Sequence, residues 1–320
     1  MSAPNASHML EAAWRERRSV LSVGLEPCAE YLPGAGAGAG AGGSPFAPTI
    51  VGYERWLMAV AEAAAPFASA YKFNLAFFEA LGPEGWSLLK RVRDRLPRGV
   101  MVIADAKRGD IGSTAKRYAQ ATFEWLNADA VTLNPLMGRD SAEPFLAYAG
   151  KLCYFLCLTS NPGSKDFLQS GDLFLDIARG VSTWGDPERC GLVVGATHPE
   201  QVARVREAAP RAPMLIPGVG AQGGEIESVA AAGRCLGTSA LKADRIEESA
   251  RRADAPAGPG LLFHVTRGVL PGAEESASEP AFRAAVASKC AAYRDRMAAA
   301  LGVGASADIA RVEKVSPAHA

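Results

Sequence analysis

Eight short apolar runs recur along this chain, and longer amphipathic stretches separate them. Each run has the length of one β-strand, and its continuous apolar character is typical of parallel strands that are covered on both faces. We therefore expect strands at the following positions: Val20–Leu25, Ala68–Phe73, Val100–Ala104, Ala130–Leu133, Leu152–Leu158, Gly191–Val194, Met214–Ile216 and Leu261–Val265.

The stretches between these runs repeat apolar residues with helical spacing. The clearest helical patterns are Glu54–Ala65, Gly85–Leu96, Thr114–Leu126, Glu200–Ala209 and Glu225–Ala232. Alternating strands and helices indicate parallel strands joined by crossover helices. Eight repeats in 320 residues fit a closed (β/α)8 TIM barrel better than an open sheet. We therefore predict a single α/β domain over residues 1–320, with its active site at the carboxyl ends of the strands.

Two segments interrupt this alternation. Residues 33–48 contain the run GAGAGAGAGG, which predicts a low-complexity surface loop after the first strand. Residues 234–259 are polar and rich in alanine and arginine, and they lie between the seventh helix and the eighth strand. We interpret the second segment as an insertion on the rim of the barrel, without an assigned role.

The charge balance and the cysteines exclude several classes of protein. Lysine plus arginine equals aspartate plus glutamate at 34 each, and no basic stripe with interleaved aromatic residues is present, so we expect no nucleic-acid partner. The six cysteines form no C-x-x-C pair, which argues against a zinc site, and Cys153 and Cys157 fit buried core positions. No apolar run reaches the roughly 18 residues needed to cross a bilayer, and no signal segment is visible. We therefore expect a cytoplasmic protein without a membrane partner.

Charged residues follow the third apolar run directly, from Asp105 to Asp110. Strand alternation puts Asp105 and Lys107 on the same side, where both would point into the mouth of the barrel. A further lysine, Lys72, lies at the end of the second strand. Solvated loops also carry charges of both signs, but the position of these charges at the ends of two buried strands favours a functional site.

The pattern Asp-x-Lys-x-x-Asp-Ile-x-x-Thr, from Asp105 to Thr114, closely resembles the signature of orotidine 5′-monophosphate decarboxylases. Four further motifs occur in the order expected for the longer bacterial chains of that family. These motifs are VTLNPLMGRDS at 131–141, LTSNPG at 158–163, PGVGAQGG at 217–224 and LLFHVTRGVL at 261–270. Five motifs in the correct order are far more specific than any one of them.

The resemblance implies a carboxy-lyase that converts orotidine 5′-monophosphate to uridine 5′-monophosphate, the last step of de novo UMP biosynthesis. It implies a reaction without a metal or another cofactor. Lys72, Asp105, Lys107 and Asp110 match the catalytic Lys-Asp-Lys-Asp array of the family. Lys107 matches the residue that protonates C6 of the pyrimidine.

The resemblance also implies a homodimer with shared active sites. Asp110, together with Ile111 and Thr114, matches the residues that reach into the site of a second subunit.

Elementary electrostatics agrees with this assignment. Loss of CO₂ from C6 leaves a vinyl carbanion that the pyrimidine cannot delocalise, and no motif for an electron-sink cofactor is visible. The protein must then stabilise the carbanion with a fixed charge. At an effective dielectric constant near 20, unit charges about 4 Å apart interact by roughly 4 kcal/mol. Neighbouring aspartates would keep the lysines protonated despite burial.

A phosphate site is expected at the loops after the seventh and eighth strands. The glycines of residues 217–224 let backbone N–H groups approach an anion, and Arg267 offers a planar donor fork. By resemblance, Gln222 and Arg267 hold the 5′-phosphate, and Ser160 contacts the pyrimidine amide. The segment Gly237–Ala240 is a competing candidate for the eighth-strand motif, but it contains no arginine.

This chain departs from the family pattern at four positions. Glu26 replaces the usual aspartate that contacts the ribose hydroxyls, and it is longer by one methylene. His264 and Thr266 replace an asparagine and a serine, and Phe73 replaces a proline. These changes bear on the strength of substrate binding rather than on the type of reaction.

Two other functions compete with this one. Decarboxylases and aldolases of the same barrel superfamily that act on sugar phosphates share the Asp-x-Lys-x-x-Asp pattern. They hold Mg²⁺ with an acidic residue where this chain has Lys72, a cation that would repel the metal. A phosphate-ligand-binding protein without turnover is the second alternative. Glu26 favours it, whereas the complete set of lysines and aspartates argues against it.

Overall fold

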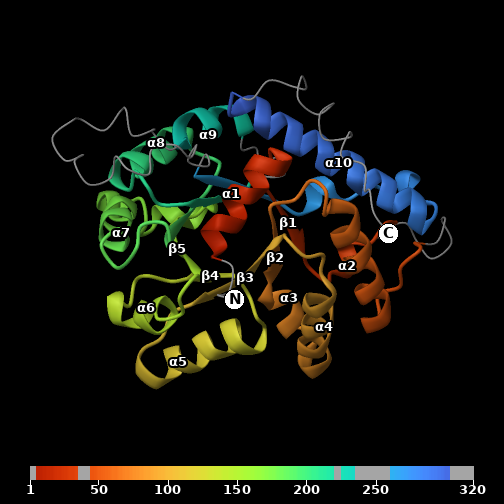
Figure 1. Cartoon of the computed structure of the whole chain (residues 1–320), viewed down its shortest axis with the longest axis horizontal. Coiled ribbons are helices and arrows are strands. Elements are labelled where there is room, and N and C mark those ends of the chain that lie inside the picture. Colours follow the sequence, from red (N-terminus) through yellow and green to blue (C-terminus); the bar gives the residue numbers. More distant parts are fainter. Residues whose placement is uncertain (1–4, 35–43, 220–224, 235–259, 303–320) are drawn as a thin grey trace, which may run out of the picture.

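Eight parallel strands form a closed barrel in the computed structural model, which describes residues 5–34, 44–219, 225–234 and 260–302 (Figure 1). Each strand pairs with its neighbours in the sequence, and β8 closes the barrel against β1. The predicted barrel is therefore confirmed. The strands are β1 (Leu21–Leu25), β2 (Ala70–Asn74), β3 (Met101–Arg108), β4 (Ala130–Leu133), β5 (Leu152–Leu158), β6 (Cys190–Val194), β7 (Met214–Ile216) and β8 (Leu261–Val265).

A helix follows every strand and covers the outside of the barrel (Figure 1). These helices are α2 (Ile50–Ala64), α3 (Leu75–Glu79), α4 (Gly82–Arg95), α5 (Gly112–Gln120), α6 (Arg139–Leu146), α7 (Leu173–Val181), α8 (Pro199–Ala208), α9 (Ile226–Gly233) and α10 (Glu279–Ala300). Apolar side chains that point outward from the strands pack against these helices in one large buried cluster.

A second, smaller apolar cluster fills the inside of the barrel. Alternation along β3 places Met101 and Ile103 in this inner cluster and Val102 and Ala104 in the outer one. An additional helix, α1 (Ala6–Arg17), lies across the barrel (Figure 1). Its Ala6 belongs to the inner cluster.

The contacts of α1 show which end of the barrel it closes. The N–H of Ala6 donates to the carbonyl of Gly150, just before β5, and the Ser7 hydroxyl donates to the carbonyl of Glu188, just before β6. Helix α1 therefore covers the amino ends of the strands, and the carboxyl ends remain for the site.

The third strand is longer than expected. The apolar run ends at Ala104, but β3 continues through the charged residues to Arg108, so our predicted boundary was wrong. The pairing with β4 shows the reason. Ala104 pairs with Val131 and Arg108 pairs with Leu133, so four steps along β3 correspond to two steps along β4. This bulge allows polar residues at the mouth of the barrel to remain in the strand.

The two interrupting segments fall mainly outside the described residues. Of the predicted 33–48 loop, residues 35–43 are not described, and of the predicted 234–259 insertion only Arg234 is. Helix α10 was not predicted, because its many alanines and its scattered charges give no clear apolar face. Within the described parts of the chain, no helix is both long and apolar enough to span a membrane. Cys153 and Cys157 are buried in β5, as predicted, and neither forms a disulfide.

Candidate active site

A cavity of about 390 Å³ opens at the carboxyl ends of the strands. Its wall includes residues from the ends of β1, β2, β3, β5 and β8 and from the loops that follow them. In barrels of this type, the carboxyl face carries the active site. Of the ten residues predicted to act on substrate, six line this cavity: Glu26, Lys72, Asp105, Lys107, Ser160 and Arg267.

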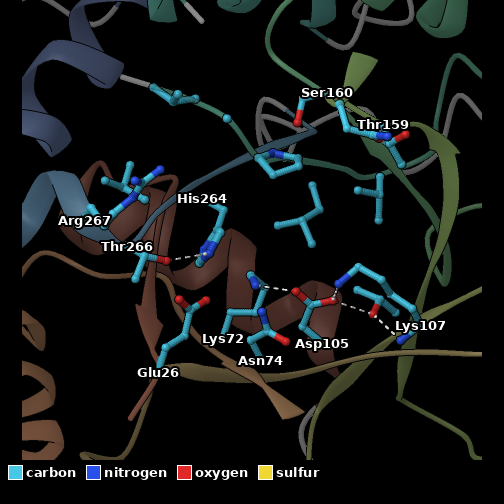
Figure 2. Close-up of a pocket in the computed structure, with 18 of the residues that line it drawn as sticks. Glu26, Lys72, Asn74, Asp105, Lys107, Thr159, Ser160, His264, Thr266 and Arg267 are labelled. Atoms are coloured by element: carbon cyan, nitrogen blue, oxygen red, sulfur yellow. Dashed lines mark hydrogen bonds and ion pairs between the residues drawn. The ribbon is translucent and has the colours of Figure 1, made fainter. Parts of the chain in front are cut away.

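Asp105 lies between two lysines in this cavity (Figure 2). The Lys72 Nζ donates to Asp105 Oδ2 at 2.5 Å, and the Lys107 Nζ donates to Asp105 Oδ1 at 2.6 Å. The side chains of Lys72 and Asp105 are 5% and 9% exposed, whereas that of Lys107 is 49% exposed. One ammonium is therefore fixed inside the barrel, and the other reaches both the cavity and solvent.

The charge on Asp105 depends on these two partners. Burial alone raises the pKa of Asp105, but the charges of Lys72 and Lys107 outweigh it and hold that pKa well below its usual range. The carboxylate is therefore ionised at neutral pH. Lys72, Asp105 and Lys107 are called the array below. The array can present a localised positive charge to a substrate while both ammonium groups stay paired with the carboxylate.

Glu26 is buried at the end of β1, next to this array. Burial raises the pKa of Glu26 above its ordinary value, because it outweighs the opposing charge of Lys72 and a hydrogen bond from Asn74. Asn74 follows Lys72 by two positions on β2, so strand alternation turns both side chains toward the cavity.

Arg267 lies on the opposite side of the cavity from Lys107 (Figure 2). It begins a short 3₁₀ turn after β8, and its side chain is exposed. Pro217, Gly218 and Val219 line the cavity after β7, and Gly218 has a φ of 92°, a conformation that favours glycine. Gln222, the other predicted phosphate ligand, lies outside the described residues.

His264 connects β1 to the loop that carries Arg267. Its Nδ1 lies 3.2 Å from the Ser22 hydroxyl, and its Nε2 lies 3.2 Å from the Thr266 hydroxyl. Burial and the charge of Lys72 lower the pKa of His264 well below its usual value, so the ring is neutral. Thr266 fits here because Gly24 has no side chain: a Cβ at Gly24 would lie 2.0 Å from the Thr266 Oγ1.

Asp110, Ile111 and Thr114 are described by the structure but lie outside the lining of this cavity. Asp110 accepts a hydrogen bond from the N–H of Ile111, and Ile111 is 52% exposed. The single chain therefore does not bring these three predicted residues together with Lys72, Asp105 and Lys107.

Sequence reasoning missed several residues of this wall. Asn74 could have been found from its alternation with Lys72, and Thr132 from its place in the VTLNP motif. Tyr31, in the loop after β1, also lines the cavity, but no pattern in the sequence marks it. Within the described residues, no group of three or more His, Cys, Asp or Glu side chains is arranged to hold a metal ion.

A family model and individual relatives of this chain carry the same family name. Residues 48–234 match the model of the Orotidine 5′-phosphate decarboxylase / HUMPS family. The chain is 46% identical over 227 residues to an orotidine 5′-phosphate decarboxylase of Herpetosiphon aurantiacus, a match that covers 69% of this chain and 81% of that relative. It is 40% identical over 296 residues to the enzyme of that name from Aromatoleum aromaticum, covering 90% and 98% of the two chains.

Solved structures extend the comparison to the fold. The structure of Leishmania donovani OMP decarboxylase superposes with a TM-score of 0.67 at 34% identity, covering 91% of this chain and 98% of that one. A structure described as a putative orotidine-monophosphate decarboxylase from Toxoplasma gondii has a TM-score of 0.72 at 34% identity, covering 93% and 97%.

Proposed function

This chain belongs to the orotidine 5′-phosphate decarboxylase / HUMPS family, and we propose that its Lys72–Asp105–Lys107 array carries out the reaction of the relatives named above. The chain is a carboxy-lyase that decarboxylates orotidine 5′-monophosphate to uridine 5′-monophosphate in pyrimidine biosynthesis. One observation carries the proposed mechanism: Asp105 holds two lysine ammonium groups, and all three residues line the cavity.

In the proposed reaction, the bond between C6 and the carboxylate carbon breaks, CO₂ leaves, and the electron pair remains on C6. The Lys107 ammonium stabilises that carbanion and transfers a proton to it, so a C6–H bond forms and Lys107 becomes neutral. Because the Lys107 side chain is half exposed, solvent can return the proton for the next cycle. Lys72 keeps Asp105 ionised and oriented throughout.

The remaining cavity residues would hold the substrate at both ends. Arg267 binds the 5′-phosphate, and Glu26 accepts hydrogen bonds from the ribose hydroxyls. Ser160 contacts the pyrimidine amide, and Gln222 joins Arg267 at the phosphate. Binding energy from the phosphate end offsets the cost of orienting the orotate ring beside Lys107.

We further propose a homodimer in which Asp110, Ile111 and Thr114 complete the partner's site. All three lie on the exposed segment that follows β3, outside the chain's own cavity. Leu136 and Met137, in the loop after β4, are 60% and 46% exposed and add apolar surface that a second copy could cover. The two loops lie side by side: the N–H of Asn134 donates to the carbonyl of Arg108, and a Cβ at Gly109 would lie 3.0 Å from the Cβ of Asn134. A cytoplasmic location, expected for this pathway, stays a prediction that fractionation can test.

A sugar-phosphate decarboxylase that uses Mg²⁺ is the alternative activity. The position where such an enzyme needs an acidic ligand holds the Lys72 ammonium, which is already paired with Asp105. A cation there opposes a divalent metal and favours the nucleotide reaction.

The direct test is the ultraviolet absorbance change of orotidine 5′-monophosphate with purified protein in excess EDTA. We expect rapid conversion by the native chain. Lys107→Ala should reduce kcat by several orders of magnitude while circular dichroism and the melting temperature stay near native values. Substantial turnover by Lys107→Ala would remove Lys107 as the proton donor. Activity that disappears with EDTA and returns with Mg²⁺ would favour the metal-dependent reaction.

A further inference from the structure

The hydroxyl of Thr132 lies at the centre of the hydrogen bonds that join β3 to β4 beside the array. Its Oγ1 lies 2.9 Å from Asp105 Oδ1 and 3.0 Å from the backbone nitrogens of both Ala106 and Lys107. The residue is 1% exposed, so little solvent competes for these bonds.

The chemistry of a threonine hydroxyl fixes the direction of each bond. The group has one proton to donate and two lone pairs that accept. The N–H groups of Ala106 and Lys107 occupy the lone pairs, so the proton is directed to Asp105. The oxygen that receives it, Oδ1, is the same one that accepts from the Lys107 Nζ. The hydroxyl has no hydrogen-bonding capacity left for a substrate.

The bulge in β3 explains why such a residue is needed. Between the pairs Ala104–Val131 and Arg108–Leu133, β3 contains two residues more than β4. Regular pairing with β4 carbonyls is therefore interrupted. Lys107 also has a φ of 49°, in the left-handed region that is costly for a residue with a side chain. Thr132 gives two of the N–H groups in the bulge an acceptor and so holds this conformation.

We propose that Thr132 is a positioning residue for the decarboxylation: its hydroxyl fixes both the backbone from which Lys107 extends and the carboxylate oxygen that orients the Lys107 ammonium. Thr132 acts through these two residues and touches no reacting atom. The proposal rests on the assignment of Lys107 as the proton donor. It goes beyond that assignment because it identifies the residue that holds the Lys107 backbone and orients the Lys107 ammonium.

The test compares Thr132→Val, which keeps the shape but removes the hydroxyl, with Thr132→Ser, which keeps the hydroxyl. A displacement of a reacting group by about 1 Å can lower the rate of the reaction on the order of 10²-fold. We therefore expect Thr132→Val to lower kcat roughly 10- to 100-fold. The KM for orotidine 5′-monophosphate and the Kd for uridine 5′-monophosphate should stay within about twofold, since no binding contact is lost. Thr132→Ser should recover most of the activity.

Thr122→Val is the matched control. Thr122 is also buried, but its hydroxyl donates to the carbonyl of Tyr118 in the helical segment after β3, outside the cavity lining. This variant should leave kcat unchanged. If Thr132→Val does not fold, Thr132→Ala replaces it, because the smaller side chain leaves room for a water to satisfy the two N–H groups.

Three outcomes would overturn the proposal: a native kcat in Thr132→Val, an equal loss of kcat in Thr132→Ser, or a loss no larger than that of Thr122→Val. A double-mutant cycle adds a fourth. Thr132→Val should cost less in an Asp105→Asn background than in the native enzyme, because only its bonds to the backbone of Ala106 and Lys107 then remain to be lost, and full additivity would show that it does not act through Asp105. An active Lys107→Ala enzyme would instead remove Lys107 as the proton donor, which is the assignment that this proposal rests on, so the two failures are distinguishable.

Discussion

Charges at this site are placed at opposite sides of one cavity, with Arg267 on one side and Lys107 on the other (Figure 2). The surroundings set the state of ionisation of two residues here. Asp105 is held as a carboxylate by two lysines, and His264 is held neutral by burial and by the charge of Lys72. At the scale of single residues, the chemistry therefore follows from which groups are close enough to set the pKa of one another.

Replacing Arg267 with alanine should mainly weaken substrate binding. A hydrogen bond to a charged group contributes about 1.5–3 kcal/mol, so we expect the KM for orotidine 5′-monophosphate to rise roughly 10- to 100-fold. Steady-state kinetics measures this change. Arg179→Ala, which removes an exposed arginine paired with Asp176 in α7, is the matched control and should have no effect. An unchanged KM in Arg267→Ala would place the phosphate elsewhere.

Glu26 should make binding sensitive to acid. The ionised carboxylate is the stronger acceptor for the ribose hydroxyls, and burial raises the pKa of Glu26 above its ordinary value of 4.5. As pH falls through that raised pKa, Glu26 becomes protonated, so kcat/KM should fall at a higher pH than an exposed glutamate would give.

The pH profile of Glu26→Gln isolates this effect, because ionisation of the substrate phosphate is common to both enzymes. The variant should lose the part of the acid limb that belongs to Glu26. His264→Asn should keep it, since that variant leaves the Glu26 carboxylate in place. Identical native and Glu26→Gln profiles would contradict the assignment.

At the scale of elements, the barrel depends on contacts that tie loops to strand ends. Arg206, in α8, is 2% exposed although it is charged. Its guanidinium donates to backbone carbonyls near the end of α9 and before β7 and β8, namely those of Ala209, Pro210, Ala212, Gly233 and Gly260. The arginine thus gives a donor to a group of carbonyls at this junction, two of which, those of Ala209 and Gly260, also accept from the N–H groups of Ala212 and Met214.

Arg206→Met should lower the free energy of unfolding by about 3 kcal/mol, because it removes the arginine's hydrogen bonds to five carbonyls, among them those of the buried Ala212 and Gly233. Urea denaturation measures the loss. Arg211→Met is the control: Arg211 is 59% exposed in a surface ion pair with Glu188, so its loss should stay below about 1 kcal/mol. The kcat of folded Arg206→Met should be native, since these contacts lie at the amino ends of the strands. A native unfolding free energy would contradict this role.

At the scale of the whole molecule, the main prediction is that two chains share each site. Lys107→Ala and Asp110→Ala chains should each be nearly inactive alone. In a mixed dimer, one site combines the intact Lys107 of one chain with the intact Asp110 of the other. Random exchange of equal amounts should therefore restore about one quarter of native activity, because half of the dimers are mixed and each has one complete site.

The measurement mixes the two variants, allows subunit exchange and follows substrate absorbance, while two different affinity tags confirm that mixed dimers form. Recovery in proportion to the mixed dimer supports sharing. No recovery, with mixed dimers present, would mean that Asp110 does not act in the partner's site.

The pattern of apolar runs was sufficient to predict the barrel and to place charged residues at its carboxyl face. The runs Ala130–Leu133, Leu152–Leu158, Met214–Ile216 and Leu261–Val265 became strands with the predicted bounds, because strands buried on both faces must be apolar throughout. The carboxyl ends of parallel strands meet at one end of a barrel, so the residues that follow those runs had to come together.

How these residues act on one another depends on contacts between strands that are distant in the sequence. The bulge in β3, the left-handed conformation of Lys107 and the three bonds of Thr132 depend on the register between two strands, which the pattern of one strand does not contain. The ionisation of Glu26 and His264 likewise depends on burial by distant segments. Local patterns specify which face a residue occupies, whereas distances and charges between elements are fixed only when the barrel closes.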